Sequence, residues 1–202
     1  MSAIVQDDVD PKKRRFLILA TSAVGGVAGG ATAVPFVASM FPSVRALAAG
    51  APVEYDLSKV EPGQLVTVEY RGAPHWIIRR TPEVVAQLDK NEALLADPGS
   101  EESKQPEFAK GANRSSDKSG EWFVVKGVCT HLGCSPQLRK RVVPADDLGA
   151  DWPGGFFCPC HQSKFDMSGR VFKGQPAPKN LEITAYKIEG TKLTIDADLK
   201  GA

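Results

Sequence analysis

The sequence predicts a mainly β protein, with an antiparallel β-sandwich head preceded by one N-terminal transmembrane helix. Three observations lead to this prediction. An uncharged stretch runs from Phe16 through Val44. Short alternating runs rich in valine, isoleucine, threonine and aromatic residues follow it, as in half-buried strands. Among these runs, two boxes hold all 4 cysteines, and we expect them to be hairpin-like loops on a small β subdomain inserted into the head.

The uncharged stretch is long enough to cross a bilayer. As a helix, Phe16–Met40 would extend about 37 Å at 1.5 Å per residue, against a hydrocarbon core of roughly 30 Å. We therefore assign residues 16–42 as a transmembrane anchor. Lys12–Arg15 precede it and a single Arg45 follows. The positive-inside rule places residues 1–15 in the cytoplasm and the head across the inner membrane, in the periplasm.

The anchor has features beyond its length. Pro35 should kink it or end its regular part, and glycines four apart within 25–30 would let another helix approach closely. Arg14–Leu17 resembles a twin-arginine export signal, although that motif usually has one residue between the arginines and the Phe-Leu pair. We favour one segment that serves as both signal and anchor. A secretory signal cleaved at the small residues 46–50 is the alternative.

A linker and a head follow the anchor. Residues 43–52 are rich in alanine and glycine, which favours a flexible neck; a passive tether is the alternative. The head would then occupy residues 53–202.

The composition limits what the head can bind. With 42% hydrophobic residues among 202, the chain can bury a core. The 25 basic and 24 acidic residues give a net charge of +1. Nucleic-acid binding requires clustered basic residues, so we expect no nucleic-acid partner.

The head contains seven candidate strands and one clear helix signal. Thr81 at the N-cap and Pro82 at the first helical position predict a helix to about Lys90. Glu189-Gly190-Thr191 predicts a hairpin turn between the last two strands. The strands are expected at 65–70, 76–79, 122–128, 155–157, 181–184, 186–189 and 192–196.

Two features of the head give no sign of site chemistry. Residues 96–120 are mostly serine, glycine, proline and charged residues, so we expect a solvated loop or a partly mobile excursion. His75 has no cysteine or other histidine near it in sequence. We expect it to be a structural histidine and leave it out of the site.

The two boxes, Cys129–Cys134 and Cys158–Ser163, hold all 4 cysteines and two of the 3 histidines. In each box one cysteine and one histidine lie close enough to reach a common metal, and one cysteine is left over. Four metal ligands and one disulfide would use up this inventory. A structural zinc site is the alternative, although neither box has the usual zinc-finger spacing.

The pair of boxes, C-T-H-L-G-C and C-P-C-H-Q-S, resembles the two cluster loops of the Rieske iron–sulfur proteins of cytochrome bc complexes. The resemblance implies a Rieske β-sandwich head with a cluster-binding subdomain at about 127–178. It also implies a [2Fe–2S] cofactor. The implied metal ligands are Cys129 and Cys158 on one iron and His131 and His161 on the other, and the implied disulfide joins Cys134 to Cys160. Neutral imidazoles in place of two thiolates raise the reduction potential.

The family's activity supplies the functional expectation. Such a subunit oxidises quinol and passes the electron to a c-type cytochrome, with proton release, in a dimeric respiratory complex. The expected substrate is ubiquinol or another quinol, and the expected partners are cytochrome b, a c-type cytochrome and the membrane. His161 and His131 would be the catalytic residues of this quinol:cytochrome c oxidoreductase subunit. We expect His161 to accept the quinol hydrogen bond, because an imidazole pKa that shifts with the charge of its iron links electron and proton transfer.

The resemblance also assigns residues around the cluster. Ser163 stands where the family donates a hydroxyl hydrogen bond to a bridging sulfide, and Phe165 where many members have a tyrosine. Gln162 replaces a commoner glycine, although a residue with a Cβ adopts positive φ reluctantly. Leu132 would shield the cluster at the tip or pack within its loop. Residues 174–178 resemble the proline loop that covers the cluster; an ordinary stiff connector is the alternative.

Two other functions share these boxes. An exported Rieske subunit of a molybdenum oxidase, such as arsenite oxidase, also has the disulfide and an export signal, but would pair with a large soluble enzyme. A Rieske ferredoxin serving an oxygenase is disfavoured by the anchor and by Cys134 and Cys160, which simpler ferredoxins usually lack.

Overall fold

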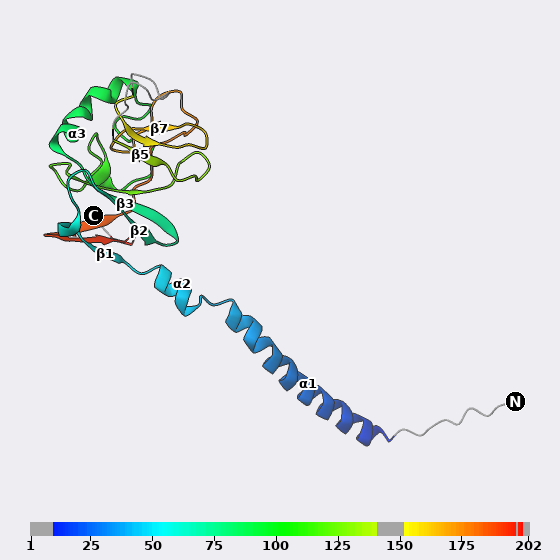
Figure 1. The fold of residues 1–202 in the computed structure, drawn as a ribbon. Coiled ribbons are helices and arrows are strands. Elements are labelled where there is room, and N and C mark those ends of the chain that lie inside the picture. Colours follow the sequence, from blue (N-terminus) through cyan, green and yellow to red (C-terminus); the bar gives the residue numbers. More distant parts are fainter. Residues whose placement is uncertain (1–9, 141–151, 197, 200–202) are drawn as a thin grey trace. The chain divides into compact units, whose positions relative to one another are not determined.

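The computed structural model describes residues 10–140, 152–196 and 198–199. Contacts divide the chain into two units, Met1–Ala48 and Ala49–Ala202. The first unit is helical and the second holds all the described strands (Figure 1). Residues 1–9 of the expected cytoplasmic tail lie outside the described residues, so the structure does not bear on them.

The first unit consists of α1 (Pro11–Ser39) and most of α2 (Val44–Ala49). Asp10 caps α1, because its carboxylate accepts the N–H of Lys12 at 2.9 Å. Pro11 occupies the first helical position, where its missing donor costs nothing. By length and composition, Pro11–Ala48 is able to cross a membrane, with a mean hydropathy of 1.7 and no buried residue in its most apolar window.

Three details of this unit differ from the expected ones. α1 starts at Pro11, so Lys12–Arg15 form its first turns; lysine and arginine are good helix formers. It continues past Pro35 to Ser39 instead of ending there. The expected neck contains α2, whose first turn is capped by the Ser43 hydroxyl accepting the N–H of Ala46 at 3.1 Å.

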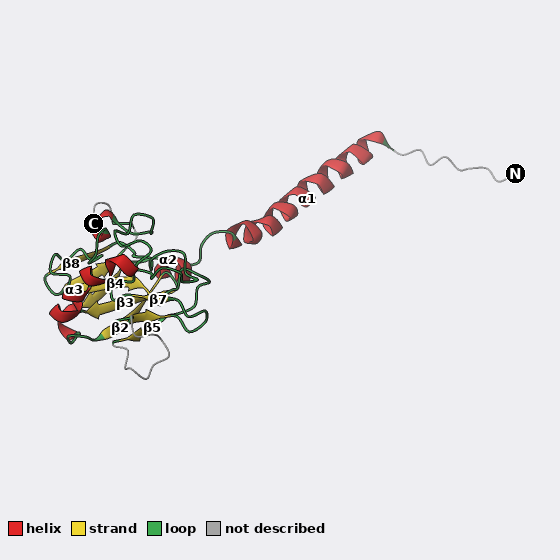
Figure 2. Ribbon diagram, turned by 90° about the horizontal axis from the view of Figure 1, so that it is seen from above, coloured by secondary structure: helices red, strands yellow, loops and turns green. Residues whose placement is uncertain are grey.

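The head contains three antiparallel sheets of three strands each. Figure 2 shows the strands in yellow, with α3 (Pro82–Gln87) at the edge of the head. The first sheet has the order β1 (Val53–Asp56), β9 (Lys192–Ile195), β8 (Tyr186–Glu189). The second has the order β2 (Leu65–Tyr70), β3 (Ala73–Arg79), β4 (Trp122–Lys126). The third has the order β5 (Gln137–Arg139), β6 (Gly155–Phe157), β7 (Lys164–Phe165). The remaining elements are 3₁₀ helices at Leu57–Lys59, Asp89–Leu94 and Glu107–Ala109.

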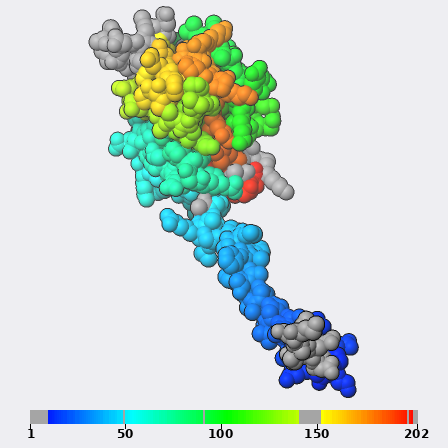
Figure 3. Space-filling model, turned by 90° about the vertical axis from the view of Figure 1, so that its right-hand side faces the viewer, coloured from blue at the N-terminus to red at the C-terminus, as the bar shows by residue number. Residues whose placement is uncertain are grey.

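One hydrophobic core joins the second and third sheets. β3 is the central strand of its sheet, and residues 75–78 are buried on both faces, so this strand does not alternate. From β3, Trp76 stacks on Phe156 of β6 with ring centroids 5.3 Å apart. The third sheet therefore rests on the second through aromatic packing. Within the head, this third sheet lies at the end away from β1 (Figures 1 and 3).

Most of the expected strands are confirmed, and the hairpin turn is where the sequence predicts it. Glu189 pairs with Lys192 across a two-residue turn, in which Gly190 has the φ of +61° that favours glycine. The helix after Thr81 is α3, and the 3₁₀ turn at Asp89–Leu94 follows it closely.

The strand expected at 181–184 is wrong. Leu181 and Ile183 are buried, so the alternating pattern does mark an inward face. The backbone nevertheless bonds to three separate segments: Leu181 N–H to Gly169 at 2.8 Å, Ile183 N–H to Lys104 at 3.2 Å, and the Glu182 carbonyl to Lys126 at 2.9 Å. No single partner strand forms, so the alternation comes from burial alone.

The segment 96–120 is a loop, as expected, with one 3₁₀ turn at Glu107–Ala109, but it is not simply solvated. Ser100 and Arg114 are fully buried in it, and their polar groups have partners within the head. The Asn180 amide donates to the Ser100 hydroxyl at 2.9 Å, and the Arg114 guanidinium donates to the Leu181 carbonyl at 2.7 Å. The polar composition therefore reflects buried hydrogen bonding as well as solvent contact.

Candidate metal centre

The two boxes are short loops closed by their own backbone. In the first, which follows β4, Cys129 N–H donates to the Cys134 carbonyl at 2.7 Å. In the second, which joins β6 to β7, Cys158 N–H donates to the Ser163 carbonyl at 2.9 Å. Only the second box is the tip of a hairpin of the small sheet, because the first connects β4 and β5 of different sheets.

A disulfide joins the boxes. It links Cys134 to Cys160, with a Cα–Cα distance of 6.6 Å. The pairing is the one that the resemblance implies. Cys129 and Cys158 remain free and are buried, so they are the two thiols left to bind a metal. The sulfur of Cys158 also lies within 4.8 Å of both disulfide sulfurs, so the disulfide packs directly against this candidate ligand.

The two histidines of the boxes face each other. The His131 and His161 rings stand edge to face, with centroids 4.6 Å apart and an interplanar angle of 88°. His161 is exposed and His131 is half-buried. The Nδ1 atom of His131 is buried, and no hydrogen-bond partner for it lies in the described part of the chain. A buried ring nitrogen that lacks a partner costs free energy unless something binds it.

These residues fit a metal cofactor with two sulfur and two nitrogen ligands. Burial raises the pKa of the Cys129 thiol, and contact with the Cys158 sulfur adds to this, whereas hydrogen bonds from the His131 backbone and the Ser163 side chain lower it. A bound cation would hold both cysteines as thiolates. It would also give His131 Nδ1 the partner that it lacks.

The proline loop orients the Ser163 hydroxyl. Ala177 lies between Pro176 and Pro178, so its amide is the only backbone donor of the three residues. This N–H donates to the Ser163 oxygen at 3.1 Å. The hydroxyl oxygen thus accepts from the loop, and its own proton is left to donate toward the Cys129 sulfur, the contact that lowers the thiol pKa.

Two residues at the rim of the site resolve points that the sequence left open. Leu132 is 70% exposed, so it does not pack within its own loop. Gln162 has a φ of +63° and therefore adopts the left-handed conformation despite its Cβ. The departure from glycine leaves the loop conformation in place and adds backbone strain to it.

His75 lies apart from the boxes, as expected. It is buried, its Nδ1 lies 3.1 Å from the Ala73 carbonyl, and its Nε2 lies 2.8 Å from the Thr184 hydroxyl. Both ring nitrogens have structural partners, which is consistent with a structural histidine.

Sequence reasoning missed the contacts that fasten the proline loop to the boxes. The Thr130 hydroxyl donates to the Lys179 carbonyl at 2.6 Å, and the Gln175 side chain accepts the N–H of Lys164 at 3.0 Å. Because Thr130 lies inside the first box, the sequence indicated that it is near the site, but it did not indicate which residue it would bond. Nothing in the sequence indicates the bond of Gln175.

Comparisons with known proteins agree with this geometry. The family model described as "Rieske [2Fe-2S] domain" matches residues 110–187. A second, described as "Ubiquitinol-cytochrome C reductase Fe-S subunit TAT signal", matches residues 5–43. The ubiquinol-cytochrome c reductase iron-sulfur subunit of Allochromatium vinosum is 55% identical over 178 residues, which cover 88% of this chain and 84% of the relative. The chain belongs to the Rieske iron–sulfur subunits of ubiquinol–cytochrome c reductase.

Further relatives of this Rieske subunit support the same assignment. The subunit of the same name from Blastochloris viridis is 42% identical over 192 residues, 95% of this chain and 96% of the relative. A solved structure titled "Hyperthermophilic respiratory Complex III" is 28% identical and covers 87% of this chain and 97% of its own, with a TM-score of 0.48. The assignment rests on the sequence relatives alone.

Membership of the family decides several expectations. The Rieske subunit carries a Rieske-type [2Fe–2S] cluster, which excludes the zinc alternative. It transfers electrons as part of an oxidoreductase complex and has cytochrome partners there. Its N-terminal segment combines a twin-arginine-type signal with an apolar helix, as in a single-pass membrane protein.

Proposed function

We propose that Cys129 and Cys158 bind one iron of the cluster and that His131 and His161 bind the other. The observation that carries this assignment is the pair of imidazoles, 4.6 Å apart beside two buried free thiols. The cluster supplies a one-electron acceptor of high potential, because neutral imidazoles replace two thiolates.

The difference in exposure between the histidines gives them different tasks. His161 is exposed, so its ring is open to a substrate hydroxyl, whereas half-buried His131 is shielded. His161 accepts the hydrogen bond of ubiquinol or a similar quinol and then takes its proton. With the reduced cluster bound, His161 would hold the quinol proton on its free ring nitrogen, and would release it once the electron had passed to a c-type cytochrome.

The exposed Leu132 lies in the first box next to His131 and faces solvent in this chain. We assign it to contact with the wall of a quinone pocket that cytochrome b supplies. Among the described residues of the head, Leu94 and Leu132 are the exposed large hydrophobic residues, and Leu132 is the more exposed of the two and lies in a cysteine box. Within the complex, which we take to be dimeric, this contact would exclude water from the quinol hydrogen bond.

The N-terminal unit would hold the head at the membrane. Lys12–Arg15 form the first turns of α1 and only Arg45 follows the span. The positive-inside rule then gives a cytoplasmic N-terminus and a periplasmic head, linked by the neck at 43–52. Protease digestion of spheroplasts tests the orientation, because only a periplasmic head is cleaved. Retention of the chain in membranes after carbonate washing, and co-purification with two cytochromes in mild detergent, test the anchor and the partners.

The His161→Cys variant tests the role of His161. A thiolate in this position keeps a cluster but removes the ring nitrogen that binds the proton. We expect the midpoint potential to fall and to lose its dependence on pH, with quinol oxidation abolished. His75→Gln changes the third histidine, which lies outside the boxes, and should keep both properties. Unaltered quinol oxidation by His161→Cys would refute the proposal.

A further inference from the structure

Three arginines are buried beneath the third sheet of the head. Arg80, Arg114 and Arg170 are each 2% exposed or less. They come from the end of β3, from the segment 96–120 and from the turn at 166–170. All three meet at that turn, which follows β7 and closes with a bridge between Phe165 and Val171. The turn therefore connects the second cysteine box to the segment that leads into the proline loop.

The charge of Arg170 is neutralised by an ion pair with Asp166. Arg170 Nε donates to the Asp166 carboxylate at 2.8 Å, and both side chains are buried. The same carboxylate also accepts the backbone N–H of Ser168 at 2.9 Å and of Arg170 at 2.8 Å. Asp166 and Arg170 thus form a buried ion pair with the hydrogen bonds that such a pair requires.

The other two guanidinium groups bind neutral oxygens. Arg80 donates to the Gly120 carbonyl at 2.7 Å and to the Ser168 hydroxyl at 2.6 Å. Arg114 donates to the Ser168 carbonyl at 2.9 Å and to the Gln105 side chain at 3.1 Å. In the described residues neither guanidinium forms an ion pair with a carboxylate.

These two charges are neither paired nor screened by water. The Nε atom of Arg114 has no hydrogen-bond partner in the described part of the chain. Burial lowers the pKa of both arginines to about 10, which leaves them charged at neutral pH. The carboxylates that act on them, Asp117 and Asp166 on Arg80 and Asp97 and Asp166 on Arg114, form no ion pair with either guanidinium among the described residues. Each of the two arginines therefore keeps an unpaired positive charge in the interior of the head.

This charge lies near the second box, across an apolar layer. An added Cβ on Gly155 would meet the backbone of Asp166 at 2.7 Å, so the two backbones touch. Cys158 lies three residues further along, or about 10 Å at 3.3 Å per residue. Phe156 and Phe165 are both fully buried in the hydrophobic core that also contains Cys158. Apolar side chains screen a charge far less than water does.

We propose that Arg80 and Arg114 raise the reduction potential of the cluster through the unpaired positive charge that they place behind the second cysteine box. The added electron makes the cluster more negative, so a fixed positive charge stabilises the reduced form more than the oxidised form. For a unit charge about 15 Å away at an effective dielectric constant of about 20, the equilibrium changes roughly sixfold. At 59 mV per tenfold change, this is about 45 mV.

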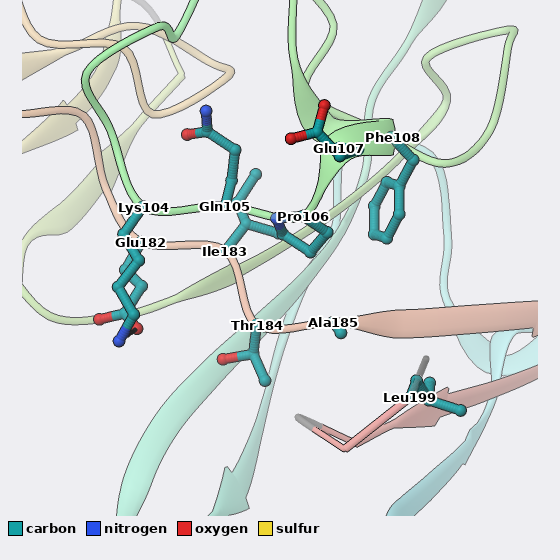
Figure 4. A pocket seen from close by; sticks show the side chains of 10 residues that line it. All are labelled: Lys104, Gln105, Pro106, Glu107, Phe108, Glu182, Ile183, Thr184, Ala185 and Leu199. Atoms are coloured by element: carbon teal, nitrogen blue, oxygen red, sulfur yellow. Dashed lines mark ion pairs between the residues drawn. The ribbon is translucent and has the colours of Figure 1, made fainter. Parts of the chain in front are cut away.

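Gln105 offers a way to neutralise Arg114 without removing it. It lines an open groove of about 720 Å³ between 104–108 and 182–185 (Figure 4). Its amide also donates to the Ser100 carbonyl. Gln105→Glu places a carboxylate on the guanidinium but loses that donor. Gln105→Met loses the same donor and also the oxygen that accepts from Arg114, and it adds no charge. The wild type keeps this acceptor without a charge, so comparing all three proteins separates the charge from the lost hydrogen bonds.

The experiment is a redox titration of the full-length holoprotein in detergent, followed by electron paramagnetic resonance. We expect the midpoint potential of Gln105→Glu to lie below that of Gln105→Met, by an amount that corresponds to a several-fold change in the equilibrium constant of reduction. Salt should have little effect on this difference, because the charge is buried. The midpoint potential of Arg114→Gln should fall in the same way, whereas that of Arg114→Lys, which keeps the charge, should stay near the wild-type value. Arg71→Gln, which removes an exposed charge paired with Asp198, should change nothing.

Two outcomes would overturn the proposal. Equal potentials for Gln105→Glu and Gln105→Met would show that the charge is not felt at the cluster. Equal losses in Arg114→Lys and Arg114→Gln would assign Arg114 a purely structural role. If the Arg114 variants fail to fold, the Gln105 pair decides alone, because Gln105 is only partly buried and its replacement leaves the Arg114 guanidinium in place. The inference rests on the proposed cluster site, but the wild-type spectrum tests that site separately.

Discussion

The amide of Ala177 donates a 3.1 Å hydrogen bond to the hydroxyl oxygen of Ser163. Ser163 is fully buried beside the free thiols, and its hydrogen bond lowers the pKa of Cys129. The proline loop at 174–178 therefore orients the hydroxyl that acts on the Cys129 sulfur. A donor to sulfur stabilises negative charge, and so favours the reduced cluster.

Ser163→Ala should lower the midpoint potential. A hydrogen bond to a charged group contributes about 1.5–3 kcal/mol; if about half of this distinguishes the two redox states, the potential falls by roughly 30–65 mV. Protein-film voltammetry measures the shift. Ser119→Ala removes an exposed hydroxyl bonded to Asp117 and should leave the potential unchanged. An unchanged potential in Ser163→Ala would contradict the assigned role.

Phe165→Tyr should raise the midpoint potential. Phe165 is fully buried in the same hydrophobic cluster as Cys129 and Cys158, and the family's tyrosine at this position donates to a cysteine sulfur. The new hydroxyl would add a second donor to the one from Ser163. Its stability cost should be small if the bond forms, and about 1–3 kcal/mol if the hydroxyl is left unsatisfied. A lower or unchanged midpoint potential in Phe165→Tyr would count against this prediction.

Gln162→Gly should stabilise the head. A left-handed conformation costs a residue with a Cβ about 1–2 kcal/mol, and glycine avoids this cost. Glycine also has greater conformational freedom in the unfolded chain, which offsets about 0.5–1 kcal/mol of the gain. The net gain is therefore about 0.5–1 kcal/mol. Thermal unfolding of the holoprotein measures it. Gly133→Ala is the converse control, because Gly133 has a φ of +82° in the first box, and it should destabilise.

The head should lose stability as the pH falls below about 6.5. Burial lowers the pKa of His75 from 6.5, and Lys126 lowers it further, whereas the Ala73 hydrogen bond and Glu182 oppose them. Below the unfolded pKa the unfolded chain therefore binds more protons, so the contribution of neutral His75 is lost as the pH drops. The slope is at most about 1.4 kcal/mol per pH unit.

Unfolding in denaturant between pH 5 and 8, in wild type and His75→Gln, measures this contribution. The variant keeps groups that can bond Ala73 and Thr184 but does not titrate. A slope equal in both proteins would place the acid sensitivity elsewhere.

The local chemistry of the site was predictable, because each box is short and each ligand type has a fixed chemistry. The disulfide between Cys134 and Cys160, and the turn at Gly190, followed from local pattern or family resemblance. Burial of Arg114 did not. Its backbone carbonyl partners lie on Ser168, Gly169 and Leu181, more than fifty residues away in sequence. Local sequence alone therefore predicts that such an arginine is exposed to solvent.

Short strands were missed for a related reason. β5 and β7 have three and two residues, too few for a periodic pattern to appear. They exist because each pairs with β6, so long-range pairing defines them. The strand expected at 181–184 failed in the opposite sense, since its pattern was present and its partner strand was not.

The most direct test of the central claim is electron–nuclear double resonance of the reduced full-length protein from cells supplied with ¹⁵N-histidine. The account predicts two distinct histidine nitrogens coupled to the cluster, and the loss of one of them in His161→Cys. A spectrum without histidine coupling, or with both couplings intact in that variant, would contradict ligation by His131 and His161.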